Sequence, residues 1–144
     1  LFNYVEKHGT PLYELINNNV ESSRKVFFVH GGTDVEDREE VRNLTETESN
    51  AIIVASYGTF STGINIKRLH NIVFASPSKS RIRNLQSIGR VLRKGEGKDI
   101  ATLYDIADDI GGQNYTLKHL NERVNIYNNE NFKYEVIRVN LRAN

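Results

Sequence analysis

The stretch 26-VFFVHGGT-33 joins a four-residue apolar run to a turn that contains two adjacent glycines. Other short apolar runs rich in β-branched side chains recur along the chain, which is typical of buried strands. Segments with helical periodicity separate them: one begins at Thr10, and another follows Thr33 with acidic residues in its first turn. The apolar runs are Val26 to Val29, Ala51 to Ala55, Asn71 to Ala75 and Ile100 to Leu103.

This alternation of strands and helices predicts a parallel sheet. Because the runs are apolar throughout, both faces of the sheet should be covered, giving a three-layer α/β fold. The helix from Thr10 has Pro11 at its start and should place Leu12, Leu15 and Ile16 on one buried face. Ligands of such sheets bind at the carboxyl ends of the strands. The loops after Val29, Ala55 and Ala75 are therefore the first places to look for a site.

The composition is that of one globular domain. The chain has 144 residues, 38% of them hydrophobic, and no cysteine, so it has neither disulfides nor a thiolate zinc site. Its four histidines lack metal-ligand spacing, and we expect no metal site. No apolar run is long enough to span a membrane and no leader opens the chain, which predicts a cytoplasmic protein. The sequence starts at Leu1 and contains no methionine, so we expect it to be part of a longer protein.

Charge is nearly balanced overall but segregated along the chain. Residues 33–50 contain seven acidic side chains and two arginines, whereas residues 79–98 contain seven basic side chains and one glutamate. An anionic partner should meet the basic stretch. Two solvated helix faces of opposite sign are the alternative.

Two loops that follow strands carry candidate anion-binding groups. His30, Gly31 and Gly32 allow close approach of a phosphate, or they form a tight turn that Thr33 caps. The span 56-SYGTFSTGINI-66 has four serine and threonine hydroxyls and two glycines, which suits an anion cradle or an ordinary loop. The chain contains no Walker A sequence.

The span 80-SRIRNLQSIGRVLRK-94 predicts one helix that ends before Gly95. At about 100° per residue, Gln86, Arg90 and Arg93 share a narrow stripe opposite an apolar face. Two guanidinium groups on one face suit a phosphate chain. Pairing of these arginines with acidic residues of a neighbouring helix is the alternative.

The 86-QSIGRVLR-93 segment resembles motif VI, QxxGRxxR, of the superfamily-two helicases, and 61-STGINI-66 resembles the end of their motif V. The start of the chain, through the histidine-glycine turn, resembles the region of motif IV in the second RecA-like lobe. The resemblance implies a helicase C-terminal RecA-like lobe over residues 1–110. Residues 111–144 would form an extension packed on it within one structural domain.

The resemblance also implies roles for individual residues. Arg90 and Arg93 would reach the γ-phosphate of ATP, with Arg93 as the arginine finger, and Gln86 would orient them or the attacking water. Gly63 and Asn65 match the nucleotide end of motif V, although Asn65 replaces the usual aspartate. Contacts to DNA would come from His30, Gly31, Gly32, Ser56, Tyr57, Gly58, Thr59, Lys79, Arg81 and Arg83.

The implied function is that of a DNA helicase or translocase lobe that remodels branched DNA in recombination, repair and replication. ATP and Mg²⁺ would be held mainly by an N-terminal RecA-like lobe, since this chain has neither Walker A nor a DExx motif, and the isolated chain should be inactive. A RecA-like module that binds DNA or protein without ATP chemistry is an alternative. An RNA helicase or restriction-translocase lobe is another.

The end of the chain gives weaker signals. Asp105, Asp108 and Asp109 are interpreted as a solvated turn rather than a metal site, and 111-GGQN-114 as a loop. Leu117, Leu120, Val124 and Tyr127 recur at helical spacing and predict an amphipathic helix. The mixed run from Phe132 to Leu141 predicts an exposed edge strand.

Overall fold

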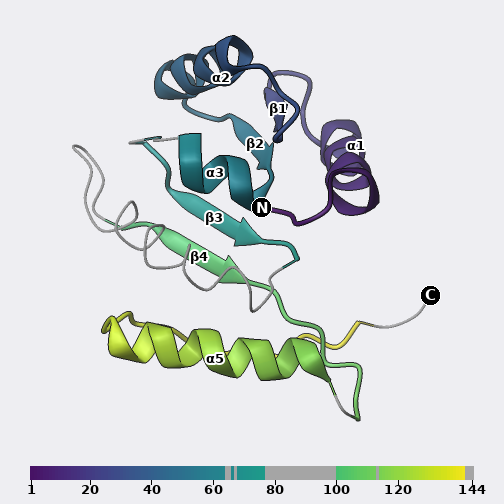
Figure 1. The fold of residues 1–144 in the computed structure, drawn as a ribbon, viewed down its shortest axis with the longest axis vertical. Helices are drawn as coiled ribbons and strands as arrows, with labels where there is room; N and C mark the ends of the chain where they lie inside the picture. The colour runs from purple at the N-terminus through teal and green to yellow at the C-terminus, as the bar shows by residue number, and fades with distance from the viewer. Residues whose placement is uncertain (64–65, 67, 77–99, 113, 142–144) are drawn as a thin grey trace.

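A computed structural model describes residues 1–63, 66, 68–76, 100–112 and 114–141 of the chain. Strands and helices alternate along most of it, as the sequence predicts. Figure 1 shows them with the labels used below. The elements are η1 (Val5–Gly9), α1 (Thr10–Asn19), β1 (Val26–Val29), α2 (Val35–Thr47), β2 (Ile52–Ala55), α3 (Tyr57–Gly63), β3 (Asn71–Phe74), β4 (Thr102–Asp105) and α5 (Tyr115–Asn129).

The strands of the described residues form two parallel pairs. In one pair β1 lies beside β2, and in the other β3 lies beside β4. The first three predicted strands are confirmed, but β4 begins at Thr102 and not at Ile100. Its ladder starts where the Thr102 amide donates to the His70 carbonyl at 2.9 Å, and Ile100 is exposed. Backbone pairing, and not the extent of the apolar run, fixes the start of this strand.

Residues 1–3 join the two pairs of strands. The Phe2 amide donates to the Ala55 carbonyl, and the Phe2 carbonyl accepts from the Tyr57 amide, both at 3.1 Å. On the other side, the Leu1 amino group donates to the Val73 carbonyl, and the Leu1 carbonyl accepts from the Ala75 amide. This short segment therefore acts as a central strand between β2 and β3.

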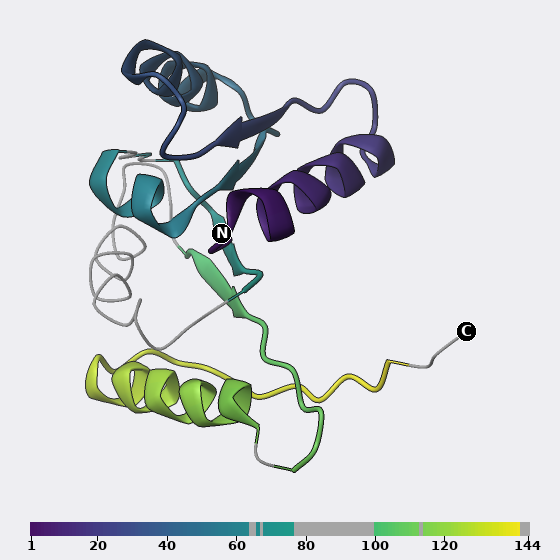
Figure 2. The same cartoon turned by 45° about the vertical axis from the view of Figure 1, so that its right-hand side comes forward.

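Helices cover both faces of the β1–β2 pair, which confirms the three-layer arrangement. Figure 2 shows α1 on one side of these strands and α2 and α3 on the other. Successive strand residues point to opposite faces. Accordingly, Phe28 stacks on Tyr13 of α1 with 5.2 Å between ring centroids, whereas Val29 belongs to the core cluster that includes Phe60 of α3. The expectation that Leu15 is buried is wrong, because its side chain is 63% exposed and Tyr13 makes the contact with β1 instead.

Helix α5 confirms the predicted amphipathic helix. Tyr127 is buried in the core cluster, and Val124 packs against it. The loop before the helix is also confirmed: Gly111 and Gly112 both have positive φ, at 76° and 66°, a conformation that glycine adopts without strain. No helix among the described residues is both long and apolar enough to cross a membrane.

The predicted edge strand from Phe132 to Leu141 is wrong over the residues described. The structure assigns no strand from 132 to 141, and Val136, Ile137 and Val139 are all more than 70% exposed. Alternating β-forming residues need a neighbouring strand to take up their backbone hydrogen bonds. Phe132 and Tyr134 instead lie beside Tyr127, with ring centroids 6.4 and 6.1 Å away.

Helical structure starts earlier than the sequence indicates, at Val5 and not at Thr10. The first turn, η1, brings Gly9 against the ring of Phe2, which is fully buried between the two strand pairs. A Cβ atom at position 9 would lie 2.6 Å from two ring carbons of Phe2. Glycine at this position thus lets the helix approach the central segment closely.

Replacing this glycine should weaken the fold. Gly9→Ala gains about 1 kcal/mol of helix propensity, but crowding the rigid Phe2 ring costs about 1–3 kcal/mol. We therefore expect a lower urea midpoint for unfolding, with an unchanged slope. Gly31→Ala is the matched control, since a Cβ there meets nothing within 4 Å. Equal stability of both variants and the wild type would contradict the packing described here.

Candidate functional site

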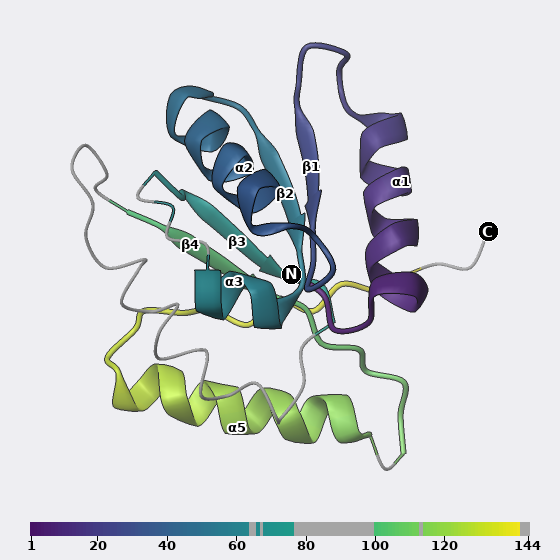
Figure 3. The same ribbon diagram turned by 45° about the horizontal axis from the view of Figure 1, so that its top comes forward.

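The carboxyl ends of all the strands lie at one edge of the sheet. Figure 3 shows the arrowheads of β1 to β4 directed toward this edge, where residues 1–3 also lead into η1. The loops that the sequence indicates as candidate sites after Val29, Ala55 and Ala75 start from this edge. Parallel strands bring such loops together whatever their separation in the chain.

The turn after β1 is held by its own side chains. The His30 amide donates to Thr33 Oγ1 at 3.0 Å, and the Gly32 amide donates to His30 Nδ1 at 3.1 Å. The His30 ring also lies 5.2 Å from the ring of Phe28. The segment therefore forms a tight turn that Thr33 stabilises. Gly31 and Gly32 are exposed, so DNA could reach both of them. The Gly32 amide already donates within the turn, and contact of either glycine with DNA stays a prediction.

The segment after β2 is a helix and not the predicted loop. Ser56 Oγ donates to Thr59 Oγ1 at 2.8 Å and accepts from the Thr59 amide at 3.3 Å, which caps the start of α3. Ser61 Oγ likewise donates to the Gly58 carbonyl. The hydroxyls of Ser56, Thr59 and Ser61 thus bond within the helix, and their part in an anion cradle stays a prediction.

Burial also limits which of these residues can touch a ligand. Tyr57 and Thr59 are only 3% and 4% exposed, and the Tyr57 ring packs edge-on against Phe74 at 5.3 Å. Ser56 and Gly58 are half-buried. In this part of the chain, the predicted DNA contacts are therefore best suited to Ser56 and Gly58, while Gly63 is the last residue of α3.

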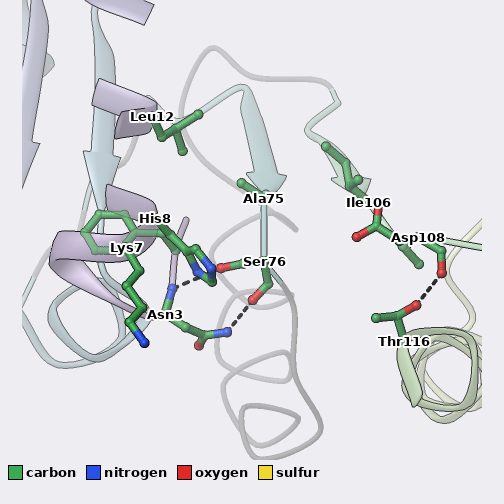
Figure 4. A pocket seen from close by; sticks show the side chains of 11 residues that line it. Asn3, Lys7, His8, Leu12, Ala75, Ser76, Ile106, Asp108 and Thr116 are labelled. Carbon is green, nitrogen blue, oxygen red and sulfur yellow. Dashed lines mark hydrogen bonds between the residues drawn. The ribbon is translucent and has the colours of Figure 1, made fainter. Parts of the chain in front are cut away.

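A pocket of about 510 Å³ opens at the same edge, between η1 and the ends of β3 and β4. We call it the edge pocket. In Figure 4, Lys7 and His8 lie on one side of it, Ala75 and Ser76 lie in the middle, and Ile106, Asp108 and Thr116 lie on the other side. Its lining consists of Phe2, Asn3, Lys7, His8, Leu12, Ala75, Ser76, Ile106, Ala107, Asp108 and Thr116.

Hydrogen bonds fix the walls of the edge pocket. The Asn3 amide donates to Ser76 Oγ at 3.0 Å, and the Asn3 side-chain amide donates to the Ser76 carbonyl. Across the pocket, the Asp108 carbonyl accepts from Asn114 Nδ2 at 2.7 Å and from Thr116 Oγ1. The loop after β4 is thereby tied to the start of α5.

A buried ion pair ties the other end of this loop to α5. Arg123 Nε and Nη2 donate to the two carboxylate oxygens of Asp105 at 2.7 and 2.9 Å, and Tyr127 Oη donates to Asp105 Oδ2 at 2.6 Å. Arg123 is 2% exposed. Burial, together with the bond to Asp105, raises the pKa of Tyr127, so its hydroxyl stays protonated as a donor.

This arrangement corrects the interpretation of the three aspartates as one solvated turn. Asp108 and Asp109 are exposed, but the side chain of Asp105 is only 10% exposed because Arg123 neutralises it. Nη1 of Arg123 has no hydrogen-bond partner among the described residues. In those residues no group of three acidic or histidine side chains could hold a metal ion.

Several residues of this edge were not found from the sequence. Lys7, His8, Ser76 and Arg123 belong to no pattern of the chain, and only the topology brings them near the strand ends. Other predicted site residues lie outside the part of the chain that the structure describes, and for them the predictions stand untested. They are Asn65, Lys79, Arg81, Arg83, Gln86, Arg90 and Arg93.

Comparison with known proteins gives a family match and several relatives. Residues 3–95 match the helicase conserved C-terminal domain. The chain is 42% identical to the ATP-dependent DNA helicase UvsW of Enterobacteria phage T4, over 98% of this chain and 30% of that protein. It is 32% identical to a putative ATP-dependent RNA helicase of Acanthamoeba polyphaga mimivirus, over 67% of this chain and 17% of that protein.

A second putative ATP-dependent RNA helicase, from African swine fever virus, is 32% identical over 46% of this chain and 13% of its own length. The chain thus spans less than a third of the length of these relatives. No solved structure matches it.

Replacing one partner of the buried ion pair should lower the unfolding free energy more than replacing both partners. Arg123→Met leaves the Asp105 carboxylate buried without its cation, and we expect a loss of about 3–5 kcal/mol in unfolding free energy. The double variant Arg123→Met with Asp105→Asn should recover part of this loss. Chemical denaturation of the four proteins in this cycle measures the coupling. Purely additive effects would contradict a direct pair.

Proposed function

Because the chain belongs to the family of helicase conserved C-terminal domains, we propose that it is the C-terminal RecA-like lobe of an ATP-dependent DNA helicase or translocase. The observation that carries this proposal is the 42% identity to a DNA helicase across 98% of the chain. The whole protein would remodel branched DNA in recombination, repair and replication. It would work in the cytoplasm of a bacterium, or of a bacterium infected by a phage.

In this proposal Arg90 and Arg93 act on the nucleotide. Each guanidinium would reach across to the γ-phosphate of ATP, where charge develops in the transition state, and such a group is worth about 10³–10⁵ in rate. Arg93 is the proposed finger, and Gln86 orients the arginines or the attacking water. Gly63 and Asn65 would contact the nucleotide from motif V.

The ATP and Mg²⁺ would be held mainly by the N-terminal RecA-like lobe of the whole protein. The chain has no Walker A sequence. The carboxylate of Asp105, at the end of β4, forms an ion pair with Arg123. This chain would contribute the side chains that face a nucleotide held by the N-terminal lobe. Binding of ATP would bring the two lobes together.

The DNA strand would run over the carboxyl edge of the sheet. There the exposed Gly31 and Gly32 and the half-buried Ser56 and Gly58 can approach its backbone. Lys79, Arg81 and Arg83 would add attraction that depends on salt and not on base sequence. His30, Tyr57 and Thr59 would shape this surface, since their side chains are engaged in the turn or buried.

An RNA helicase lobe is the second candidate function. Two relatives at 32% identity are named as putative RNA helicases. Competition between DNA and RNA strands of the same sequence, measured with the whole protein, distinguishes the two. Stimulation of ATP hydrolysis by RNA only would favour this candidate over the DNA helicase.

Substitution of the two arginines tests the proposed chemistry. In the full-length protein, Arg93→Ala should lower DNA-stimulated ATP turnover by about two orders of magnitude or more, with ATP and DNA binding largely kept. Arg90→Ala should act in the same direction. Arg138→Ala, which removes an exposed arginine of the tail, is the control. Unchanged turnover in both test variants would favour a binding module without ATP chemistry.

The isolated chain should not hydrolyse ATP. Without the lobe that holds ATP and Mg²⁺, its arginines have no bound nucleotide on which to act. A phosphate-release assay on the purified 144-residue chain, with and without DNA, measures this. Turnover at the rate of a complete helicase, with contaminants excluded, would show that the chain is not a second lobe.

A further inference from the structure

The edge pocket is lined by two parts of the chain that lie far apart in the sequence. Asn3, Lys7, His8 and Ser76 belong to the segment that matches the helicase family, which ends at residue 95. The opposite wall consists of residues 106–108 and Thr116, which lie beyond that match. The pocket is therefore complete only where the loop after β4 and the start of α5 meet the segment that matches the family.

Hydrogen bonds hold the end of β4 and the loop that follows it. Asp105 is clamped by Arg123 and Tyr127, and the Asp108 carbonyl is held by Asn114 and Thr116. The end of β4 and the loop residue Asp108 are thus both bonded to α5 or to its N-cap residue Asn114. A wall fixed in this way loses little conformational freedom when a ligand binds.

The lining offers three kinds of contact. Lys7 and His8 are exposed and supply positive or donor groups at one side. Leu12, Ile106 and Ala107 supply apolar surface. Asp108 supplies a carboxylate on the far side. Neither Lys7 nor Asp108 takes part in an ion pair within the described ranges, whereas Asn3 and Thr116 are occupied by hydrogen bonds in the walls.

We propose that the edge pocket binds one nucleotide unit, with its phosphate at Lys7, its base against Leu12 and Ile106, and an exocyclic amino group of the base donating to Asp108. The volume of about 510 Å³ falls within the range of small-ligand sites. A carboxylate accepts well from the amino group of cytosine. The proposal rests on the proposed function, because the nucleotide is either one residue of the bound strand or a free nucleotide.

The test uses the full-length protein and a fluorescently labelled oligo-dC, with binding followed by anisotropy over a range of salt concentrations. Lys7→Ala should weaken binding and reduce the slope of log K against log salt by about 0.7, the value for one lost phosphate contact on a single strand. Lys25→Ala is the matched control, since it removes the same charge before β1, at the opposite edge of the sheet. An unchanged slope for Lys7→Ala, on oligo-dC and on free nucleotide alike, would overturn the proposal.

Two further variants test the base contact. Asp108→Ala, at an exposed position, removes the acceptor and should abolish a preference for oligo-dC over oligo-dT, since thymine has no amino group. Ala107→Phe should fill the pocket and abolish the affinity difference between oligo-dC and an abasic strand, with its melting temperature checked against the wild type. A wild type that shows no preference between oligo-dC and oligo-dT, and none between oligo-dC and the abasic strand, would overturn the base contact.

Titration with free dCMP identifies the source of the nucleotide. If Lys7→Ala and Asp108→Ala weaken binding to the strand but not to dCMP, the pocket holds a residue of the strand. If they weaken binding to dCMP only, it holds a free nucleotide, and either result supports the pocket. Failure of the wild type to bind any DNA would count against the proposed function, while the dCMP arm would still decide on the pocket.

Discussion

The backbone hydrogen bonds of residues 1–3 are the constraint on which the rest of the fold depends. They connect β2 to β3, and thus make one continuous surface from two separate pairs of strands. The same segment buries Phe2 completely and fixes the approach of α1 through Gly9. Because all strands run parallel through this joint, their carboxyl ends meet at one edge, and that edge carries the candidate site.

The second constraint is the attachment of α5 to β4. Arg123 neutralises Asp105 where β4 ends, and Asn114 and Thr116 hold the loop that follows. A helix that the sequence places in an extension is therefore part of the surface next to the strand ends.

The strands and most helices could be predicted because their signals are local. The apolar runs and helical spacings identify β1, β2, β3, α2 and α5. The loop interpretation of α3 failed because serine, threonine and glycine favour loops in isolation, whereas Ser56 caps a helix whose Tyr57 and Phe60 are buried. The burial of Asp105 has no local signal, because its partner Arg123 lies eighteen residues away in the sequence. The role of residues 1–3 depends on contacts with residues 55–57 and 73–76, which no local pattern reveals.

The burial of the pair formed by Asp105 and Arg123 also constrains how this lobe can evolve. Loss of either charge leaves the other stranded in the protein interior, whereas exchange of both for apolar residues of similar size can be tolerated. A single substitution at either position is therefore strongly disfavoured. Homologous lobes should either retain both residues or have replaced both, so that positions 105 and 123 change together over evolutionary time.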